Sequence, residues 1–179
     1  MRPLSDFKDL FSKQSKGYAV SRPTYPKALF DLLQAWRRRK GWYGTAQPGP
    51  ARLRLCEYFD KVVASDASAR QIENARAGPN VRFAMFPEEK ADLKDASVDL
   101  VTVAQPLHWF RFDDFYREVR RISKKNGVIA TWAYDHHSIG PHLDRVSQSF
   151  YKDTIGKYWP AEVKYVENRY RTFRFLLIR

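Results

Sequence analysis

The segment from Lys61 to Ala75 constrains the fold more than any other part of this chain. Its first six residues, KVVASD, form a short apolar run that ends on Asp66 and is typical of a buried strand. The residues from Ala69 onward, ARQIENA, predict a helix that begins almost at once. Ligands of open α/β sheets bind beyond the carboxyl ends of the strands, so Asp66 is the first candidate for a functional residue.

Two interpretations of Asp66 remain open at this point. A carboxylate at the carboxyl end of a strand can accept two hydrogen bonds from a ribose diol. Asp66 and Ser68 can equally cap the helix that follows, which is a common use of both residue types.

Apolar patterns with strand and helix spacing alternate along the rest of the chain. Strand patterns cover residues 81–85, 98–104 and 128–133, and helical patterns cover residues 29–36, 55–59 and 112–122. This alternation predicts an α/β fold with a doubly wound, mainly parallel sheet.

Composition limits the size and the class of the protein. The 179 residues are 44% hydrophobic, which is enough for the core of one domain. Cys56 is the single cysteine, no apolar leader follows Met1, and no run is long enough to span a membrane. We therefore expect a soluble, cytoplasmic protein with no internal disulfide.

The net charge of +12 could attract nucleic acid, an anionic membrane or an acidic small molecule. Apart from the run from Arg37 to Lys40, the basic residues are scattered and show no face with interleaved aromatic residues, so we rank nucleic acid last as a partner. The run itself is a nuclear-import signal, a phosphate-binding patch or a solvated helix end.

A second group of candidates follows the predicted strand at residues 98–104. Gln105, His108 and Trp109 would lie at the same edge of the sheet as Asp66. His108 could act as a general base, because the ordinary pKa of histidine is near neutral. His108 and Trp109 could equally be the packed start of a helix.

Three further groups are weaker candidates. Glu88 and Glu89 could accept a hydrogen bond from an adenine amine or form a solvated acidic turn. Arg22 could clamp a ligand carboxylate or be an ordinary surface arginine. A histidine group shows no metal-ligand spacing, and we expect no metal there. Its members are His136, His137 and His142.

Four ordered strings carry a resemblance to a known family. They are YAVSRPTYP, EYFDKVVASDASARQIENA, DASVDLVTVAQPLHWF and NGVIATWAY. Together they resemble the class I S-adenosylmethionine-dependent methyltransferases of the type-11 group, in particular the plant embryo-abundant and trans-aconitate methyltransferase-like branch. The resemblance runs from about Phe7 to Phe175 and implies a Rossmann-like sheet with S-adenosylmethionine as cofactor.

The resemblance also implies a role for each candidate. Asp66 would hold the ribose hydroxyls, with Ala67 beside it, and Glu89 would lie near the adenine. Gln105, His108 and Trp109 would line the methyl-donor pocket, the latter two as catalytic residues. Three residues of an N-terminal arm would close over the methionine end of the cofactor: Tyr18, Arg22 and Tyr25.

The chain departs from the family between residues 42 and 55. The family has an apolar strand that runs into a loop of the form D-x-G-x-G-x-G, whereas this chain has no aspartate and few glycines there. Gly44 keeps the expected separation from Asp66, since 66 − 44 = 22, and is the candidate for the cofactor loop. Pro48 and Pro50 remove backbone donors from the loop, and the charged run before Gly44 leaves the central strand in doubt.

The sequence therefore predicts a single methyltransferase-like domain over residues 1–179, with an arm at 1–26, a cofactor-binding core at 27–134 and an acceptor-side segment at 135–179. The chain ends at Arg179, where the family continues, so we expect the last strands to be missing. The predicted activity is methyl transfer to a small molecule, and the alternative is a catalytically impaired binding module or isoform.

Overall fold

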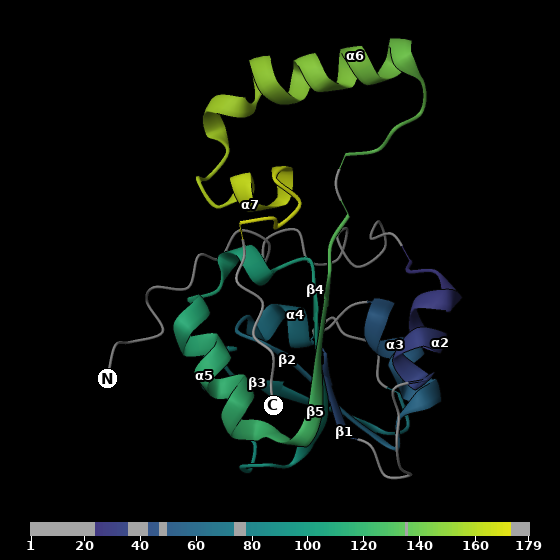
Figure 1. Ribbon diagram of the computed structural model, residues 1–179, viewed down its shortest axis with the longest axis vertical. Helices are drawn as coiled ribbons and strands as arrows, with labels where there is room; N and C mark the ends of the chain where they lie inside the picture. The colour runs from purple at the N-terminus through teal and green to yellow at the C-terminus, as the bar shows by residue number, and fades with distance from the viewer. Residues whose placement is uncertain (1–23, 36–42, 47–49, 74–77, 135, 173–179) are drawn as a thin grey trace.

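A five-stranded parallel sheet forms the centre of the molecule, and helices cover both of its faces (Figure 1). The computed structural model describes residues 24–35, 43–46, 50–73, 78–134 and 136–172. The strands are β1 (Tyr43–Ala46), β2 (Lys61–Asp66), β3 (Val81–Met85), β4 (Val98–Ala104) and β5 (Ser123–Trp132). Their order is β3-β2-β1-β4-β5, and all four pairings are parallel, so the predicted α/β fold is confirmed.

Both faces of the sheet are packed, which explains why β4 is a nearly continuous apolar run. Leu100 and Ala104 point to the side of α2 (Lys27–Ala35) and α3 (Pro50–Tyr58). Val101 and Val103 point to the opposite side, against α5 (Phe112–Ile122). The alternation follows the two-residue period of a strand.

Each face of the sheet has its own set of buried side chains. The set on the α2 and α3 face consists of Phe30, Leu33, Leu55, Phe59 and Val62. The set that α5 contributes consists of Phe115, Tyr116, Val119 and Ile122. The range of α5 is the range predicted from the sequence, because its apolar residues recur at helical spacing.

The structure contains the central strand β1. The sequence had left this strand in doubt because of the charged run that precedes it. Gly44 lies opposite Val62 of β2 and Leu100 of β4, so β1 is paired on both sides. Its four residues are too few for a periodic pattern to stand out in the sequence. Gly44 therefore lies inside the strand and not in the loop that follows it, which corrects the placement expected from the sequence.

Strand β5 begins earlier than the sequence predicted. Val98 pairs with Ser123 and Leu100 pairs with Val128, so the predicted turn at Asn126 and Gly127 is an irregularity within β5. Asn126 has a φ of 67°, in the left-handed region that asparagine tolerates better than most residues. In the part of the chain that the structure describes, no strand follows β5.

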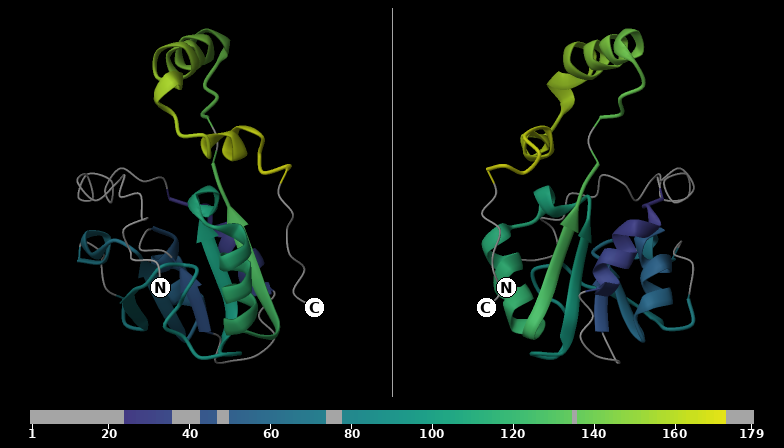
Figure 2. Two further views of the ribbon diagram at one scale, coloured as in Figure 1. Left: turned by 90° about the vertical axis from the view of Figure 1, so that its left-hand side faces the viewer. Right: turned by 45° about the vertical axis from the view of Figure 1, so that its right-hand side comes forward.

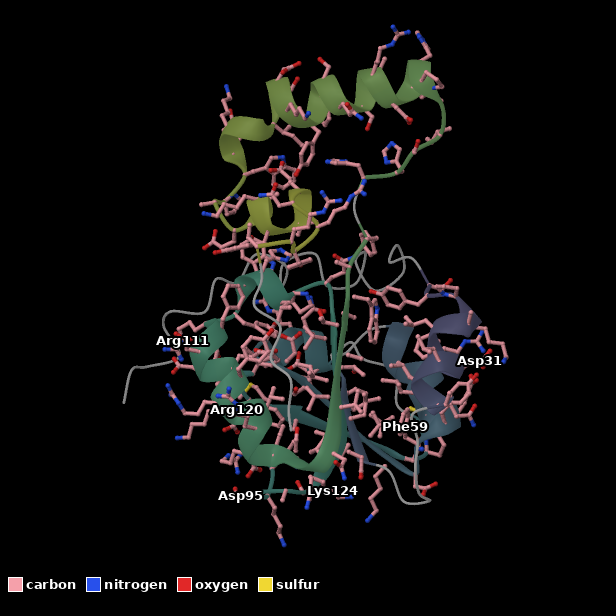
Figure 3. All side chains as sticks on the ribbon, in the orientation of Figure 1. Asp31, Phe59, Asp95, Arg111, Arg120 and Lys124 are labelled. Carbon is pink, nitrogen blue, oxygen red and sulfur yellow. The ribbon has the colours of Figure 1, made fainter. Side chains whose placement is uncertain are left out.

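The segment after β5 is helical. It contains α6 (Pro141–Ser149), a π-helical turn (Phe150–Thr154), a 3-10 turn (Gly156–Tyr158) and α7 (Val163–Glu167). Figure 2 shows α6 farthest from the sheet, with α7 between α6 and the sheet. Asp95 and Lys124 lie at the opposite end of the molecule, near the amino ends of β4 and β5 (Figure 3). The carboxyl ends of these strands therefore point toward α7.

None of the helices in the described ranges has the length and the apolar character needed to cross a lipid bilayer.

We predict that Asn80 stabilises the junction between α3 and β2. Its side-chain amide donates hydrogen bonds to the backbone oxygens of Cys56, at 3.0 Å, and of Phe59. An Asn80→Ala variant loses both bonds and should lower the free energy of unfolding by about 1–3 kcal/mol. Urea denaturation followed by circular dichroism measures this change. Gln34→Ala, at an exposed position of α2, is the control and should change stability by less than about 0.5 kcal/mol.

Candidate functional site

The carboxyl edge of the sheet is stepped at its centre, because the central strand β1 ends before its two neighbours, β2 and β4. Ala46, the last residue of β1, lies opposite Ala64, so β2 continues two residues farther to Asp66. On the other side of β1, Thr45 lies opposite Val101, which puts Ala46 level with Thr102 of β4. Gln105 therefore lies three residues beyond the level of Ala46. The strands β2 and β4 are two spacings of about 4.8 Å apart. Asp66 and Gln105 therefore flank the end of the short central strand.

This place is also the switch point of the sheet. From β1 the chain builds β2 and β3 in one direction, then crosses over to β4 and β5 on the other side. Ligands of doubly wound sheets bind where the strand order reverses in this way.

Asp66 caps the helix that follows it. Its Oδ1 accepts a hydrogen bond of 2.8 Å from the backbone N–H of Ser68, which precedes α4 (Ala69–Glu73). This bond orders the turn that leads into α4, so it supports the capping interpretation in part. This bond does not exclude the ribose interpretation, because a carboxylate has about four lone-pair sites and can accept several hydrogen bonds. Asp66 and Ala67 are both half-buried.

Gln105 has an unusual backbone conformation at the end of β4. Its φ is 79°, a region that residues other than glycine seldom adopt. Its N–H donates to the oxygen of Trp132 at 2.9 Å, and its side chain donates to the oxygen of Tyr134 at 3.5 Å. Such backbone outliers cluster at functional sites, where the surrounding structure holds them in place.

His108 is buried in the short 3-10 helix (Leu107–Trp109) that follows Gln105, with 8% of its surface exposed. Its Nδ1 lies 2.8 Å from the hydroxyl of Tyr170, and its ring lies 4.6 Å from that of Trp109. Burial lowers the pKa of His108, and the charge of Glu162 opposes this effect. Both interpretations of His108 thus have support, because the ring is packed and also has a polar partner.

Tyr170 is a residue of the site that the sequence analysis missed. It is 62 residues away from His108 along the chain, and no local pattern marks it. Burial raises the pKa of Tyr170 to about 12, so the phenol is protonated at neutral pH.

Comparison with known proteins identifies the family. The methyltransferase domain model matches residues 45–131. A protein from Dictyostelium discoideum that carries a methyltransferase name is 38% identical over 170 residues, which cover 92% of this chain and 65% of that protein. A solved structure from Anaeromyxobacter dehalogenans, named as a type II methyltransferase, has a TM-score of 0.76 at 36% identity and covers 87% of this chain and 67% of the other.

This chain belongs to the class I S-adenosylmethionine-dependent methyltransferases.

The match to longer relatives is partial. The chain spans 65% of the Dictyostelium protein and 55% of a Saccharomyces cerevisiae protein that is named as an S-adenosylmethionine-dependent methyltransferase and is 25% identical over 160 residues. A solved structure from Methanococcus maripaludis supports the fold alone, with a TM-score of 0.64 at 18% identity.

One of the arm residues predicted for this methyltransferase reaches the carboxyl edge. The ring of Tyr25 packs edge-on against Trp132, with 5.6 Å between ring centroids. Trp132 is the last residue of β5 and lies opposite Ala104, so Tyr25 is close to the end of β4. Tyr18 and Arg22, the other two arm residues, lie outside the described residues, as does the loop after β1.

Glu89 has a structural partner in this methyltransferase. Its Oε1 accepts a hydrogen bond of 3.1 Å from the backbone N–H of Arg111, and it lies 3.7 Å from the Arg111 side chain. Arg111 precedes α5, so Glu89 supplies a negative charge at the start of that helix. The adenine contact expected of Glu89 stays a prediction, and this pairing weighs against it.

His136, His137 and His142 are all exposed. His136 packs edge-on against Tyr151, with 3.8 Å between centroids. Among the residues that the structure describes, no three histidine, cysteine or acidic side chains are grouped as metal ligands would be.

A small cavity of about 40 Å³ lies between the sheet and α5, lined by Ser65, Glu88, Thr102 and apolar side chains. It has room for about three water molecules.

We predict that the burial of His108 makes the stability of this methyltransferase depend on pH. The folded state lowers the pKa of His108 from its ordinary value of 6.5, so below that pH the unfolded state binds the proton more readily. Stability should fall as the pH falls through this window. Urea denaturation between pH 7.5 and pH 5.5 should show a smaller loss for His108→Gln than for the wild type, and an equal loss would contradict the prediction.

Proposed function

We propose that this chain binds S-adenosylmethionine at the carboxyl edge of its sheet and transfers the methyl group to a small molecule. The observation that carries the proposal is the stepped edge, where Asp66 and Gln105 flank the end of β1 at the switch point. The family provides the class of reaction, and the edge provides polar groups where a nucleoside can be held.

The residues at this edge fit the cofactor at two of its parts. The half-buried carboxylate of Asp66 can accept hydrogen bonds from the ribose hydroxyls while it caps α4, with Ala67 beside it. Gln105, with its strained backbone, and Tyr25, packed on Trp132, are near the end of β4, where the methionine half would lie. Gly44, Tyr18 and Arg22 complete the proposed cofactor site.

The chain's own residues orient the reactants and exclude water. When bound, S-adenosylmethionine would supply an electrophilic methyl group on a sulfonium, with a neutral thioether as the leaving group for in-line attack by the acceptor. Alignment of the acceptor in a dry pocket then provides most of the catalysis. His108 and Trp109 are buried or half-buried beside Gln105, where they can form the wall of such a pocket.

We assign the cofactor to the core at residues 27–134 and the acceptor to the segment at 135–179. The helices of this segment lie beyond the carboxyl ends of the strands (Figure 1). They expose large apolar side chains that can contact an acceptor. These side chains are Leu143, Val146, Phe150, Tyr158 and Trp159.

Isothermal titration of the chain with S-adenosylhomocysteine tests the proposal. A dissociation constant in the micromolar range supports cofactor binding, with titrations of adenosine and of homocysteine alone as ligand controls. No heat at millimolar S-adenosylhomocysteine would reject the proposed activity and leave a methyltransferase-like module without a cofactor.

A further inference from the structure

The segment from residue 136 to residue 172 contains no fully buried residue. The structure describes all of this segment, and every residue in it keeps part of its surface exposed. Its two α-helices are short, since α6 has nine residues and α7 has five. Helices of this length are marginal on their own in water, so contacts with the rest of the molecule must hold the segment in place.

Two tyrosines near the end of this segment contact the rest of the fold. The ring of Tyr165, in α7, packs edge-on against Phe112 at the start of α5, with 5.5 Å between ring centroids. The Tyr170 hydroxyl lies 2.8 Å from Nδ1 of His108, and Tyr170 also packs against the buried side chains of β4 and α5. We call residues 163–172, which contain both tyrosines, the strap.

The strap lies over the carboxyl end of β4. Figure 2 shows α7 between α6 and the sheet. His108, in the 3-10 helix that follows β4, is 8% exposed, and the centroid of the Tyr170 ring is 6.2 Å from that of the His108 ring. Tyr170 is therefore one of the side chains that cover His108.

The backbone of the strap has an unfavourable conformation where it reaches His108. Arg169 and Tyr170 have φ values of 51° and 53°, a region that residues other than glycine seldom adopt. Their N–H groups donate to the oxygens of Val166 and Tyr165, both at 2.8 Å, so the turn is held by bonds within the strap. Strained residues of this kind persist only where the surrounding structure holds them. The turn can therefore relax when the strap leaves the core.

The strap and the core beneath it differ in how firmly they are held. Regions with few buried contacts open at a lower free energy than the whole fold. The strap has no buried residue, whereas β4 and α5 contribute buried side chains to one core cluster. These include Val101, Val103, Phe115 and Val119. We therefore expect the strap to separate from the core while the sheet stays folded.

We propose that the strap is a gate that opens and closes as a unit over His108, and that the methyl acceptor enters its pocket when the strap is open. The inference rests on the proposed function, since it takes the wall formed by His108 and Trp109 as part of the acceptor pocket. Opening breaks the contacts of Tyr165 with Phe112 and of Tyr170 with His108. Closing then excludes water from the bound acceptor.

Pulse labelling with diethyl pyrocarbonate, which modifies accessible neutral imidazoles, tests the gate without substrate. Mass spectrometry of the digested chain measures the rate at each histidine, and the exposed His136, His137 and His142 are internal standards. At neutral pH the labelling of His108 should be slower than theirs. It should also change little with urea well below the denaturation midpoint, because a local opening exposes little surface.

Two results of this experiment would overturn the gate. Labelling of His108 as fast as that of the exposed histidines would show that the strap does not cover it. A rate that rises steeply with urea, in parallel with hydrogen exchange of the β4 amides, would show that His108 becomes accessible only when the whole fold opens.

The Tyr165→Ala variant tests whether the strap moves as a unit, because it removes the contact with Phe112. We expect labelling of His108 to become about twofold to tenfold faster, the usual effect of one aromatic pair. Tyr170→Phe, which keeps the ring and removes the hydroxyl, should have an effect of similar size. Tyr158→Phe is the matched control, since Tyr158 precedes the strap and is 73% exposed, and it should leave the rate unchanged.

An unchanged rate in Tyr165→Ala would reject the gate, even if Tyr170→Phe labels faster, because the effect would then be local to His108. The titration with S-adenosylhomocysteine separates the gate from the proposed function. If the wild type fails to bind, the proposed function is rejected, and the labelling still decides whether the strap opens over His108. If binding is normal and His108 is labelled only on global unfolding, the gate alone is rejected.

Discussion

Replacing Asp66 with alanine should weaken the binding of S-adenosylhomocysteine by about 100-fold or more. Two hydrogen bonds to a charged acceptor contribute about 1.5–3 kcal/mol each, and 1.4 kcal/mol corresponds to a tenfold change in affinity. Isothermal titration of wild type and variant measures the change. Binding of Asp66→Ala with wild-type affinity would remove the ribose contact from the proposed site.

An Asp66→Asn variant is the matched control for capping. Its side-chain oxygen can still accept the hydrogen bond from the Ser68 N–H, so the start of α4 should be preserved. Its affinity should nevertheless fall, because the amide lacks the charge and one acceptor. Asp66→Ala should in addition lose about 1 kcal/mol of stability, the usual effect of removing a cap.

Replacing Glu118 with alanine should cause the largest loss of stability, about 3 kcal/mol. Glu118 is 8% exposed, and its Oε1 accepts hydrogen bonds from the backbone N–H of Ala91 at 2.7 Å and from Arg121 at 2.6 Å. Arg121 also donates hydrogen bonds to Ala91, Leu93 and Asp95. The pair of Glu118 and Arg121 therefore holds the connection between β3 and β4 against α5.

The size of the stability loss follows from the state of Arg121, which Glu118→Ala leaves without its buried acidic partner. Removing one member of a buried pair usually costs 3–5 kcal/mol, and the lower end applies because Arg121 is 35% exposed. Urea denaturation measures the loss. Asp114→Ala is the control, since each of its pairs with the exposed Arg111 and Arg117 should contribute less than about 1 kcal/mol. Equal losses in the two variants would contradict the role of Glu118.

The sequence predicted the elements that a strong apolar pattern specifies. The ranges of β2, β3, β4 and α5 were predicted as they are found, because both faces of the sheet are covered and the apolar residues must follow strand or helix spacing. Strand β1 was in doubt, because four residues between two neighbours are held by pairing rather than by a pattern of their own. The early start of β5 was missed for a similar reason, since its irregularity resembles a turn.

The candidate site was predictable only where residues follow the end of a strand. Asp66, Gln105 and His108 were named as candidates in this way, because the carboxyl ends of parallel strands meet at one edge. Tyr170 could not be found, because its contact with His108 depends on how the chain returns over 62 residues. The pairing of Glu89 with Arg111 is likewise tertiary and leaves no local signal.

The central position of β1 also governs the order in which the chain can fold. Gly44 needs Leu100 as its partner, and 100 − 44 = 56 residues separate them. During synthesis, one side of β1 therefore stays unpaired until β4 has left the ribosome. Contacts this distant along the chain slow folding, and an unpaired strand edge invites aggregation. The middle of the sheet is thus protected later in synthesis than the side formed by β2 and β3.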